Sequence, residues 1–233
     1  MEVMPTRLER AFAWLGGVAF VSSLALAAHV FLVRWGHGSD GEVVDWSAVW
    51  LNTLAFTAFA VHHSAFARIG VKAALARVLP GRLIRSVYVW VASGLFIAVM
   101  VWWRPVGGVL YRVEGIWAIG MAAMQGLGVL LTAVAVRAID ALDLAGIRQA
   151  PVRQDLQVRG PYRLVRHPLY LGWVLVVFGT AHMTGDRALF AGLSTLYLII
   201  AIPWEERSLR AAFGDAYARY AARVRWRMLP WVY

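Results

Sequence analysis

RGPYRLVRHPLYLGWVLVVFGTAHMTGDRALFAGLSTLYLIIAIPWEER, at residues 159–207, is the stretch that decides the fold. It begins with basic residues and two prolines, continues through apolar runs at 168–183 and 188–203, and ends in a pair of glutamates. Only residues 184–187 separate the two runs, which predicts two antiparallel helices joined by a tight turn. We therefore expect an apolar hairpin, either fully spanning or shallow, with charged groups at its open end.

The rest of the chain is also apolar. Of its 233 residues, 61% are hydrophobic and 15% are charged, and the mean hydropathy is +0.62, which is typical of a membrane protein. A spanning helix needs roughly 20 apolar residues, and four more stretches approach that length, at 11–33, 47–67, 86–103 and 115–136. The sequence predicts an all-α, polytopic transmembrane bundle of about six helices in a single domain, residues 1–233, with the last two helices as a short hairpin.

The positive charges lie mostly on one side of this predicted bundle. Two Lys or Arg residues precede the first span, five lie between the second and third, six between the fourth and fifth, and six after the last, which makes nineteen of 23. The positive-inside rule assigns that side to the cytoplasm, so we expect both termini there. The net charge of +10 then reflects topology and contact with membrane lipids, and no nucleic-acid partner is expected.

Cysteine is absent, which excludes disulfides, thiolate nucleophiles and iron–sulfur ligation. The adjacent histidines His62 and His63 have no nearby cysteine or convergent carboxylate in the sequence. Such a pair does not supply a convincing ligand set, so no metal site is expected.

The start of the hairpin carries the first group of candidate site residues. Pro168 suits the first position of a helix, because its missing N–H would be unpaired there. Arg166 and His167 would then lie at the helix entrance, where free backbone N–H groups and the helix dipole favour a carboxylate ligand. Tyr170 offers an aromatic face, and Gly172 permits close approach to the backbone. A purely structural helix cap is the alternative interpretation of this stretch.

The end of the hairpin carries the second group. Glu205 and Glu206 are suited to bind an ammonium ion, and Tyr170 is suited to face a sulfonium ion. Adjacent residues point in different directions on a helix, so we expect only one glutamate to enter the site. Alternatively, the pair is solvated or paired with Arg207 and Arg210. Basic groups at one end and acidic groups at the other suit a zwitterionic cofactor such as S-adenosylmethionine.

The motifs RHPxYxG at 166–172 and EER at 205–207 closely resemble the carboxy-terminal signature of integral-membrane methyltransferases, which include isoprenylcysteine carboxyl methyltransferases and phospholipid N-methyltransferases. The resemblance implies an S-adenosylmethionine pocket open to the cytoplasm, within about residues 137–233, and covered by an aromatic tail. The implied cofactor-binding residues are Tyr162, Arg166, His167, Pro168, Tyr170, Gly172, Glu205, Glu206, Tyr217 and Tyr220. The tail is also expected to form a cytoplasmic amphipathic helix, with Phe213, Tyr217 and Tyr220 on one face.

Further stretches, at 62–68, 85–88, 103–105, 140–149 and 182–184, resemble the NnrU-like group and especially bacterial methanethiol S-methyltransferases. This resemblance implies an enzyme of the bacterial inner membrane that methylates a small thiol, such as methanethiol to dimethyl sulfide. Two alternatives stay open: a methyltransferase for a lipid-borne acceptor, either a prenylcysteine carboxylate or a phospholipid amine, and a non-enzymatic membrane protein of the NnrU type. The sequence leaves the oligomeric state open.

A thiol acceptor needs help to ionise at neutral pH, because a free thiol has a pKa of ~8.5. The candidate catalytic residues are His62 or His63 as a base, and Arg68 and Arg148 as groups that stabilise a thiolate. The expected reaction is a direct in-line displacement at the methyl carbon, in which the protein positions the reactants and excludes water.

Overall fold

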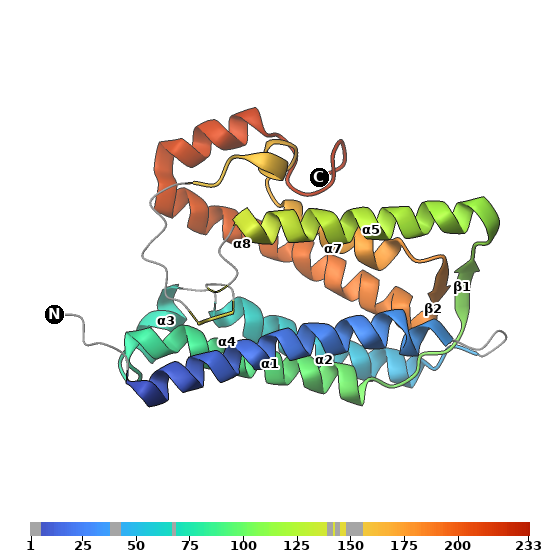
Figure 1. Ribbon diagram of the computed structural model, residues 1–233, viewed down its shortest axis with the longest axis horizontal. Coiled ribbons are helices and arrows are strands. Elements are labelled where there is room, and N and C mark those ends of the chain that lie inside the picture. Colours follow the sequence, from blue (N-terminus) through green and yellow to red (C-terminus); the bar gives the residue numbers. More distant parts are fainter. Residues whose placement is uncertain (1–5, 38–42, 67–68, 139–141, 143–144, 148–155) are drawn as a thin grey trace. The chain divides into compact units, whose positions relative to one another are not determined.

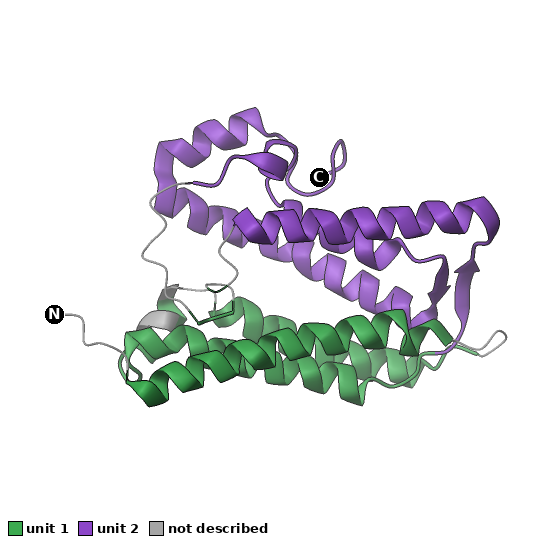
Figure 2. Ribbon diagram, in the orientation of Figure 1, with its two compact units in different colours: residues 1–37, 43–106, 141–151 green, residues 38–42, 107–140, 152–233 purple. Residues whose placement is uncertain are grey.

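The computed structural model describes residues 6–37, 43–66, 69–138, 142, 145–147 and 156–233. The chain divides into two compact units, which Figure 2 shows in separate colours. Unit 1 comprises residues 1–37, 43–106 and 141–151, and unit 2 comprises residues 38–42, 107–140 and 152–233. The single domain over residues 1–233 stays a prediction.

Unit 1 consists of helices α1 (Arg7–Leu32), α2 (Trp46–Phe66), α3 (Ile69–Leu75) and α4 (Gly81–Trp102), with the 3-10 helix η1 (Arg34–His37) after α1. Helix α4 packs against both α1 and α2 (Figure 1). Thr6 and Glu9 form a capping box at the start of α1, which satisfies two backbone N–H groups. Glu9 also pairs with Arg82 at 2.6 Å, and this ion pair ties the start of α1 to the start of α4.

Polar side chains inside unit 1 satisfy the backbone where the chain leaves its helices. Asn52 is buried in α2, donates to the Arg104 carbonyl at 2.8 Å and accepts from the Arg104 N–H at 3.0 Å. Ser86 in α4 donates to the Gly146 carbonyl at 2.9 Å. These bonds explain polar residues in otherwise apolar helices, because unpaired backbone groups are costly away from water.

Unit 2 consists of helices α5 (Gly115–Ala138), α7 (Pro168–Phe178) and α8 (Gly185–Arg223), the 3-10 helix η2 (Gly160–Arg163), and strands β1 (Val109–Arg112) and β2 (His182–Thr184). Helices α5 and α7 pack side by side (Figure 1). A Cβ on Gly128 would lie 2.7 Å from the Gly172 carbonyl oxygen, and one on Gly172 would lie 2.4 Å from Thr132 Oγ1. Small residues therefore permit the close contact, as is common between membrane helices.

The turn of the hairpin differs from the prediction. The sequence placed a helix over residues 168–183, but α7 ends at Phe178, and Gly179 follows as its cap. Residues 182–184 instead form β2, which pairs antiparallel with β1, with Val109 opposite Thr184. The helix prediction for 179–183 is wrong because hydropathy cannot distinguish a buried helix from a short buried strand.

Four helices of the described chain are long and apolar enough to cross a membrane, judged by length and composition: α1 with η1, α4, α5 and α8. The predicted all-α membrane bundle is therefore confirmed. Of the two other predicted spans, α7 has 11 residues, fewer than the ~20 that a span needs, and α2 has 21 residues but contains Asn52, His62 and His63. In the final hairpin, α7 is thus shorter than a membrane span, whereas α8 is not.

Helix α8 extends over 39 residues, past the apolar part at 188–203 and through Pro203. Its backbone leaves helical geometry at Gly214, where φ is 49° and ψ is −125°. Glycine adopts such angles without the clash that a Cβ would cause. The predicted amphipathic tail helix is therefore the last part of α8, redirected at Gly214, rather than a separate element.

Candidate functional site

The entrance of α7 is closed by the last residues of the chain. Pro168 occupies the first helical position, as predicted, and His167 is its N-cap. The N–H of Arg166 donates to the Trp226 carbonyl at 2.9 Å, and the N–H of His167 donates to the Arg227 carbonyl at 2.7 Å. The backbone N–H groups just before α7 are thus bound by the chain itself.

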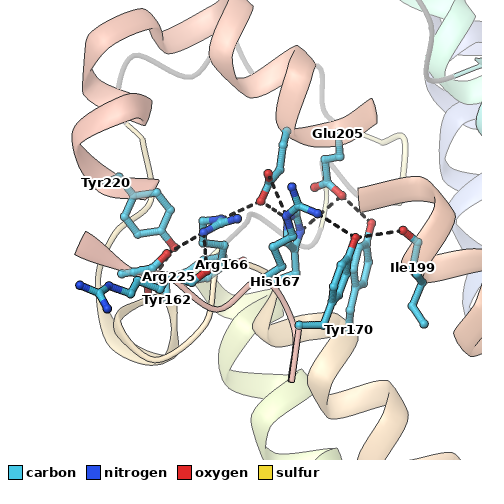
Figure 3. Close-up of polar contacts among 12 residues, drawn as sticks. Tyr162, Arg166, His167, Tyr170, Ile199, Glu205, Tyr220 and Arg225 are labelled. Carbon is cyan, nitrogen blue, oxygen red and sulfur yellow. Dashed lines mark hydrogen bonds and ion pairs between the residues drawn. The ribbon is translucent and has the colours of Figure 1, made fainter. Parts of the chain in front are cut away.

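Arg166 forms a buried ion pair with Glu206. Its Nε donates to Glu206 Oε1 at 2.6 Å, and both side chains are almost fully buried. Its Nη1 donates to the carbonyls of Val224 and Arg225, at 2.7 and 2.9 Å. Figure 3 shows Arg166 beside Tyr162 and Arg225. Glu206 belongs to α8, and Val224 and Arg225 follow that helix. Arg166 therefore joins the start of α7 to both α8 and the end of the chain, all within unit 2.

Glu206 lies beyond the apolar part of α8, close to two arginines and a histidine. Arg227 Nε lies 3.4 Å from Glu206 Oε2, and His167 Nε2 lies 3.5 Å from Glu206 Oε1. Burial by itself raises the pKa of Glu206, but the contacts with His167 and Arg166 and the charges of Arg166 and Arg227 outweigh burial and lower it to about 2. Glu206 is therefore an ionised carboxylate held in place by its partners.

Glu205 has a different environment. Its side chain is 44% exposed, against 3% for Glu206. Tyr170 Oη donates to Glu205 Oε2 at 2.7 Å, and His167 Nδ1 lies 3.6 Å from the same oxygen. The rings of His167 and Tyr170 are stacked, with centroids 5.3 Å apart and planes 7° apart (Figure 3). The result is an open carboxylate beside two parallel rings.

The aromatic residues of the tail pack under this group. Tyr220 Oη donates to the Tyr162 carbonyl at 2.8 Å, and the Tyr217 ring lies 6.0 Å from the Tyr220 ring. Tyr217 is fully buried, and among the described residues its hydroxyl has no hydrogen-bond partner. The structure therefore joins seven of the ten predicted cofactor residues through hydrogen bonds and ion pairs: Tyr162, Arg166, His167, Tyr170, Glu205, Glu206 and Tyr220. Tyr217 packs against Tyr220, and Pro168 begins α7 beside His167.

Gly172 has a clear role in helix packing. Its missing side chain allows α7 to approach Thr132 and Gly128 of α5. Close approach to a cofactor, which the sequence analysis expected of Gly172, stays a prediction.

Comparison with known proteins gives this arrangement a family. Residues 116–216 match the family described as phospholipid methyltransferase. The chain is 36% identical to methanethiol S-methyltransferase 2 of Bradyrhizobium diazoefficiens, over 76% of this chain and 71% of that protein. It is 33% identical to the methanethiol S-methyltransferase of Mycobacterium tuberculosis, over 87% of this chain and 92% of that protein.

The chain belongs to the methanethiol S-methyltransferase family. It is a membrane methyltransferase, so the alternative of a non-enzymatic protein is not supported. A third member of the family, methanethiol S-methyltransferase 1 of Bradyrhizobium diazoefficiens, is 31% identical over 99% of this chain and 86% of its own length. No solved structure matches the chain.

Two of the four predicted catalytic residues of this methyltransferase, His62 and His63, lie in α2 of unit 1. His63 Nδ1 and Tyr88 Oη share a hydrogen bond of 2.6 Å. The His62 ring packs against Phe66, with centroids 4.5 Å apart, and neither of its nitrogens has a hydrogen bond among the residues that the structure describes. Arg68 and Arg148 lie outside the described residues. All four catalytic assignments stay predictions.

Two residues of the network were missing from the sequence analysis. Arg227 contacts Glu206, and Tyr233 contacts Arg227 through a hydrogen bond of 3.1 Å from Arg227 Nη1 to Tyr233 Oη. The family match at residues 116–216 also ends before them. The sequence signal for this contact was Arg227 itself, a charged residue beside the apolar residues of the chain end. An arginine there indicates an acidic partner only once the chain end is known to fold back onto the site.

Proposed function

We propose that this methyltransferase uses S-adenosylmethionine to methylate a small thiol, with methanethiol as the acceptor and dimethyl sulfide as the product. The acceptor is supported by the relatives, several of which are methanethiol S-methyltransferases and align over most of the chain. The donor is supported by the site in unit 2. The observation that carries the proposal is the open Glu205 carboxylate beside the His167 and Tyr170 rings, next to the buried Arg166–Glu206 pair.

The polar groups of this site fit a zwitterionic donor. His167 Nε2 and Tyr217 Oη are buried, and both lie near the Glu206 carboxylate without a hydrogen bond of standard geometry among the described residues. We infer that both donate to the carboxylate of the donor, because a tyrosine hydroxyl and an imidazole N–H donate hydrogen bonds. Glu205 is suited to bind the ammonium group, because it is open to a ligand.

The two glutamates then have separate roles. Glu206 is enclosed by Arg166, Arg227 and His167, so its charge is already balanced within the protein. Glu205 has the exposed oxygen and the hydrogen bond from Tyr170. We assign Glu205 to the cation of the donor and Glu206 to holding the site together.

When bound, S-adenosylmethionine supplies a methyl group on a sulfonium sulfur, which the thiolate takes up as a new carbon–sulfur bond while the old one breaks and S-adenosylhomocysteine leaves. The ring of Tyr170 would hold the sulfonium centre by its attraction for cations. The base that takes the thiol proton stays the sequence prediction, His62 or His63. Positioning of this kind can remove ~7–11 kcal/mol from the barrier of a bimolecular reaction.

We further propose that the enzyme lies in a bacterial inner membrane with both termini in the cytoplasm. Four long apolar helices, nineteen of 23 basic residues on one predicted side, and bacterial relatives support this location. The site residues at the end of α8 and the start of α7 would then face the cytoplasmic pool of donor.

The experiment is headspace gas chromatography of dimethyl sulfide over the purified protein in detergent, supplied with S-adenosylmethionine and methanethiol. S-adenosylhomocysteine is quantified in parallel, and the two products are expected in equal amounts. Glu205→Gln is expected to lower both, whereas Glu114→Gln, at an exposed position in the loop before α5, is the matched control. If the protein binds S-adenosylmethionine but forms neither product, a lipid-borne acceptor replaces the thiol. If it binds no S-adenosylmethionine, the proposed donor is wrong.

A further inference from the structure

The last ten residues, 224–233, form a segment that we call the strap. It leaves the end of α8 at Arg223 and runs back across the start of α7. The carbonyls of Trp226 and Arg227 accept the backbone N–H groups of Arg166 and His167. Met228 is fully buried against Val174 and Ile202, so the strap is packed as well as hydrogen-bonded.

Tyr233 joins the strap to a particular point of α8. Its hydroxyl donates to the Ile199 carbonyl at 3.4 Å. The residue four positions after Ile199 is Pro203, which has no N–H and therefore cannot make the usual helical bond to this carbonyl. Tyr233 thus supplies a donor that the helix itself lacks.

Tyr233 also holds Arg227. The Tyr233 hydroxyl accepts a hydrogen bond from Arg227 Nη1 at 3.1 Å, and the guanidinium carbon lies 5.2 Å from the centre of the Tyr233 ring. Arg227 in turn places its Nε 3.4 Å from Glu206 Oε2. A continuous chain of contacts therefore runs from the Ile199 carbonyl through Tyr233 and Arg227 to Glu206.

We propose that Tyr233 and Arg227 are positioning residues for the methyl donor, a role that rests on the proposed function. Tyr233 fixes the guanidinium of Arg227, and Arg227 holds the second oxygen of Glu206 while Arg166 holds the first. Fixing Glu206 from two sides fixes the His167 ring, which lies against it and stacks on Tyr170. Neither positioning residue needs to touch the donor for this effect.

The experiment compares four variants of the full chain in detergent. Tyr233→Phe removes the hydroxyl and keeps the ring over Arg227. Arg227→Lys keeps the charge but loses the planar fork, and Arg227→Ala loses both. Val232→Ala is the control, because Val232 is 77% exposed on the same strap. Each variant is measured by calorimetric binding of S-adenosylhomocysteine, by KM for donor and for thiol, and by thermal unfolding.

We expect Tyr233→Phe to weaken S-adenosylhomocysteine binding about three- to tenfold, the usual effect of one hydrogen bond. The KM for the donor should rise by a similar factor, with the KM for the thiol and the unfolding temperature close to wild type. Arg227→Ala should weaken binding further, and Arg227→Lys should restore part of the loss. Val232→Ala should bind like wild type.

Wild-type binding by both Tyr233→Phe and Arg227→Ala would overturn the inference and leave the proposed function intact. Equal rises in both KM values together with a large fall in the unfolding temperature would also overturn it, because that result indicates general destabilisation. Absence of binding by the wild-type protein would instead contradict the proposed donor itself.

Discussion

Adjacent glutamates in this site differ because a helix turns them in different directions. Successive residues of a helix diverge by about 100°, so Glu206 faces Arg166 and the strap while Glu205 faces outward beside Tyr170. The difference in exposure, 44% against 3%, follows directly from this geometry. A motif that reads as a pair in sequence therefore consists of two residues with separate environments.

Because Glu206 is buried and Glu205 is exposed, we expect different effects when either carboxylate is replaced by an uncharged amide. Glu206→Gln would leave Arg166 and Arg227 as poorly compensated charges, which typically costs about 3–5 kcal/mol of stability for a buried pair. Glu206→Gln and His167→Ala are both expected to abolish binding of S-adenosylmethionine while the protein still inserts into the membrane. Glu205→Gln should weaken binding with little change in unfolding temperature. Thermal unfolding and calorimetric binding in detergent measure both effects.

The contrary result for this pair would be a Glu206→Gln protein that binds S-adenosylmethionine and unfolds like wild type. Such a protein would show that the buried carboxylate is not needed, and the assignment of the site would have to be abandoned.

The lowered pKa of Glu206 predicts a dependence of stability on acid. Its pKa falls from an ordinary 4.5 to about 2 in the folded protein, so the folded state favours the ionised form. This contribution is fully present above pH 4.5 and is lost as the pH falls toward 2. The unfolding temperature of the wild type should therefore fall more steeply over that interval than the unfolding temperature of Glu206→Gln. Parallel curves for the two proteins would contradict the shift.

At the scale of elements, the contact between α5 and α7 positions the start of α7. Gly128 and Gly172 allow the backbones of the two helices to lie so close that a Cβ at either position would clash with the other helix. The entrance of α7 carries His167 and Pro168, so the packing of these helices determines where the site residues lie.

Gly172→Ala should therefore destabilise unit 2. The added Cβ would lie 2.4 Å from Thr132 Oγ1 and 2.9 Å from the Gly128 carbonyl oxygen, and a backbone atom cannot move aside easily. Overpacking of this kind costs about 1–3 kcal/mol. Gly192→Ala in α8 is the control, because a Cβ there meets no atom within 4 Å. An unfolding temperature equal to wild type for Gly172→Ala would mean that the two helices are not packed as described.

At the scale of the whole molecule, the absence of cysteine allows a direct test of topology. Single cysteines are introduced at Leu110 in β1 and at Ala222 near the end of α8, both of which are exposed. A membrane-impermeant maleimide should label Leu110→Cys in intact cells and should label Ala222→Cys only after permeabilisation. The reverse pattern, or equal labelling of both, would contradict the predicted orientation.

The class of fold could be predicted from the sequence, and the two motifs that carry the candidate site could be found in it. Apolar runs of spanning length predict membrane helices because a bilayer requires every backbone group to be bonded within the segment. The Arg-His-Pro and Glu-Glu motifs were recognisable because each is contiguous. These are local properties, and local patterns can be read without knowing which segments meet.

Only the tertiary structure decided how those residues are connected. Arg166 and Glu206 are 40 positions apart, and Tyr233 meets a carbonyl 34 positions earlier. The same holds for the pairing of β1 with β2, for the different burial of Glu205 and Glu206, and for Gly172, whose close neighbour is α5. Such contacts depend on how the chain folds back, because hydropathy and spacing describe each segment's burial but not the partner against which it is buried.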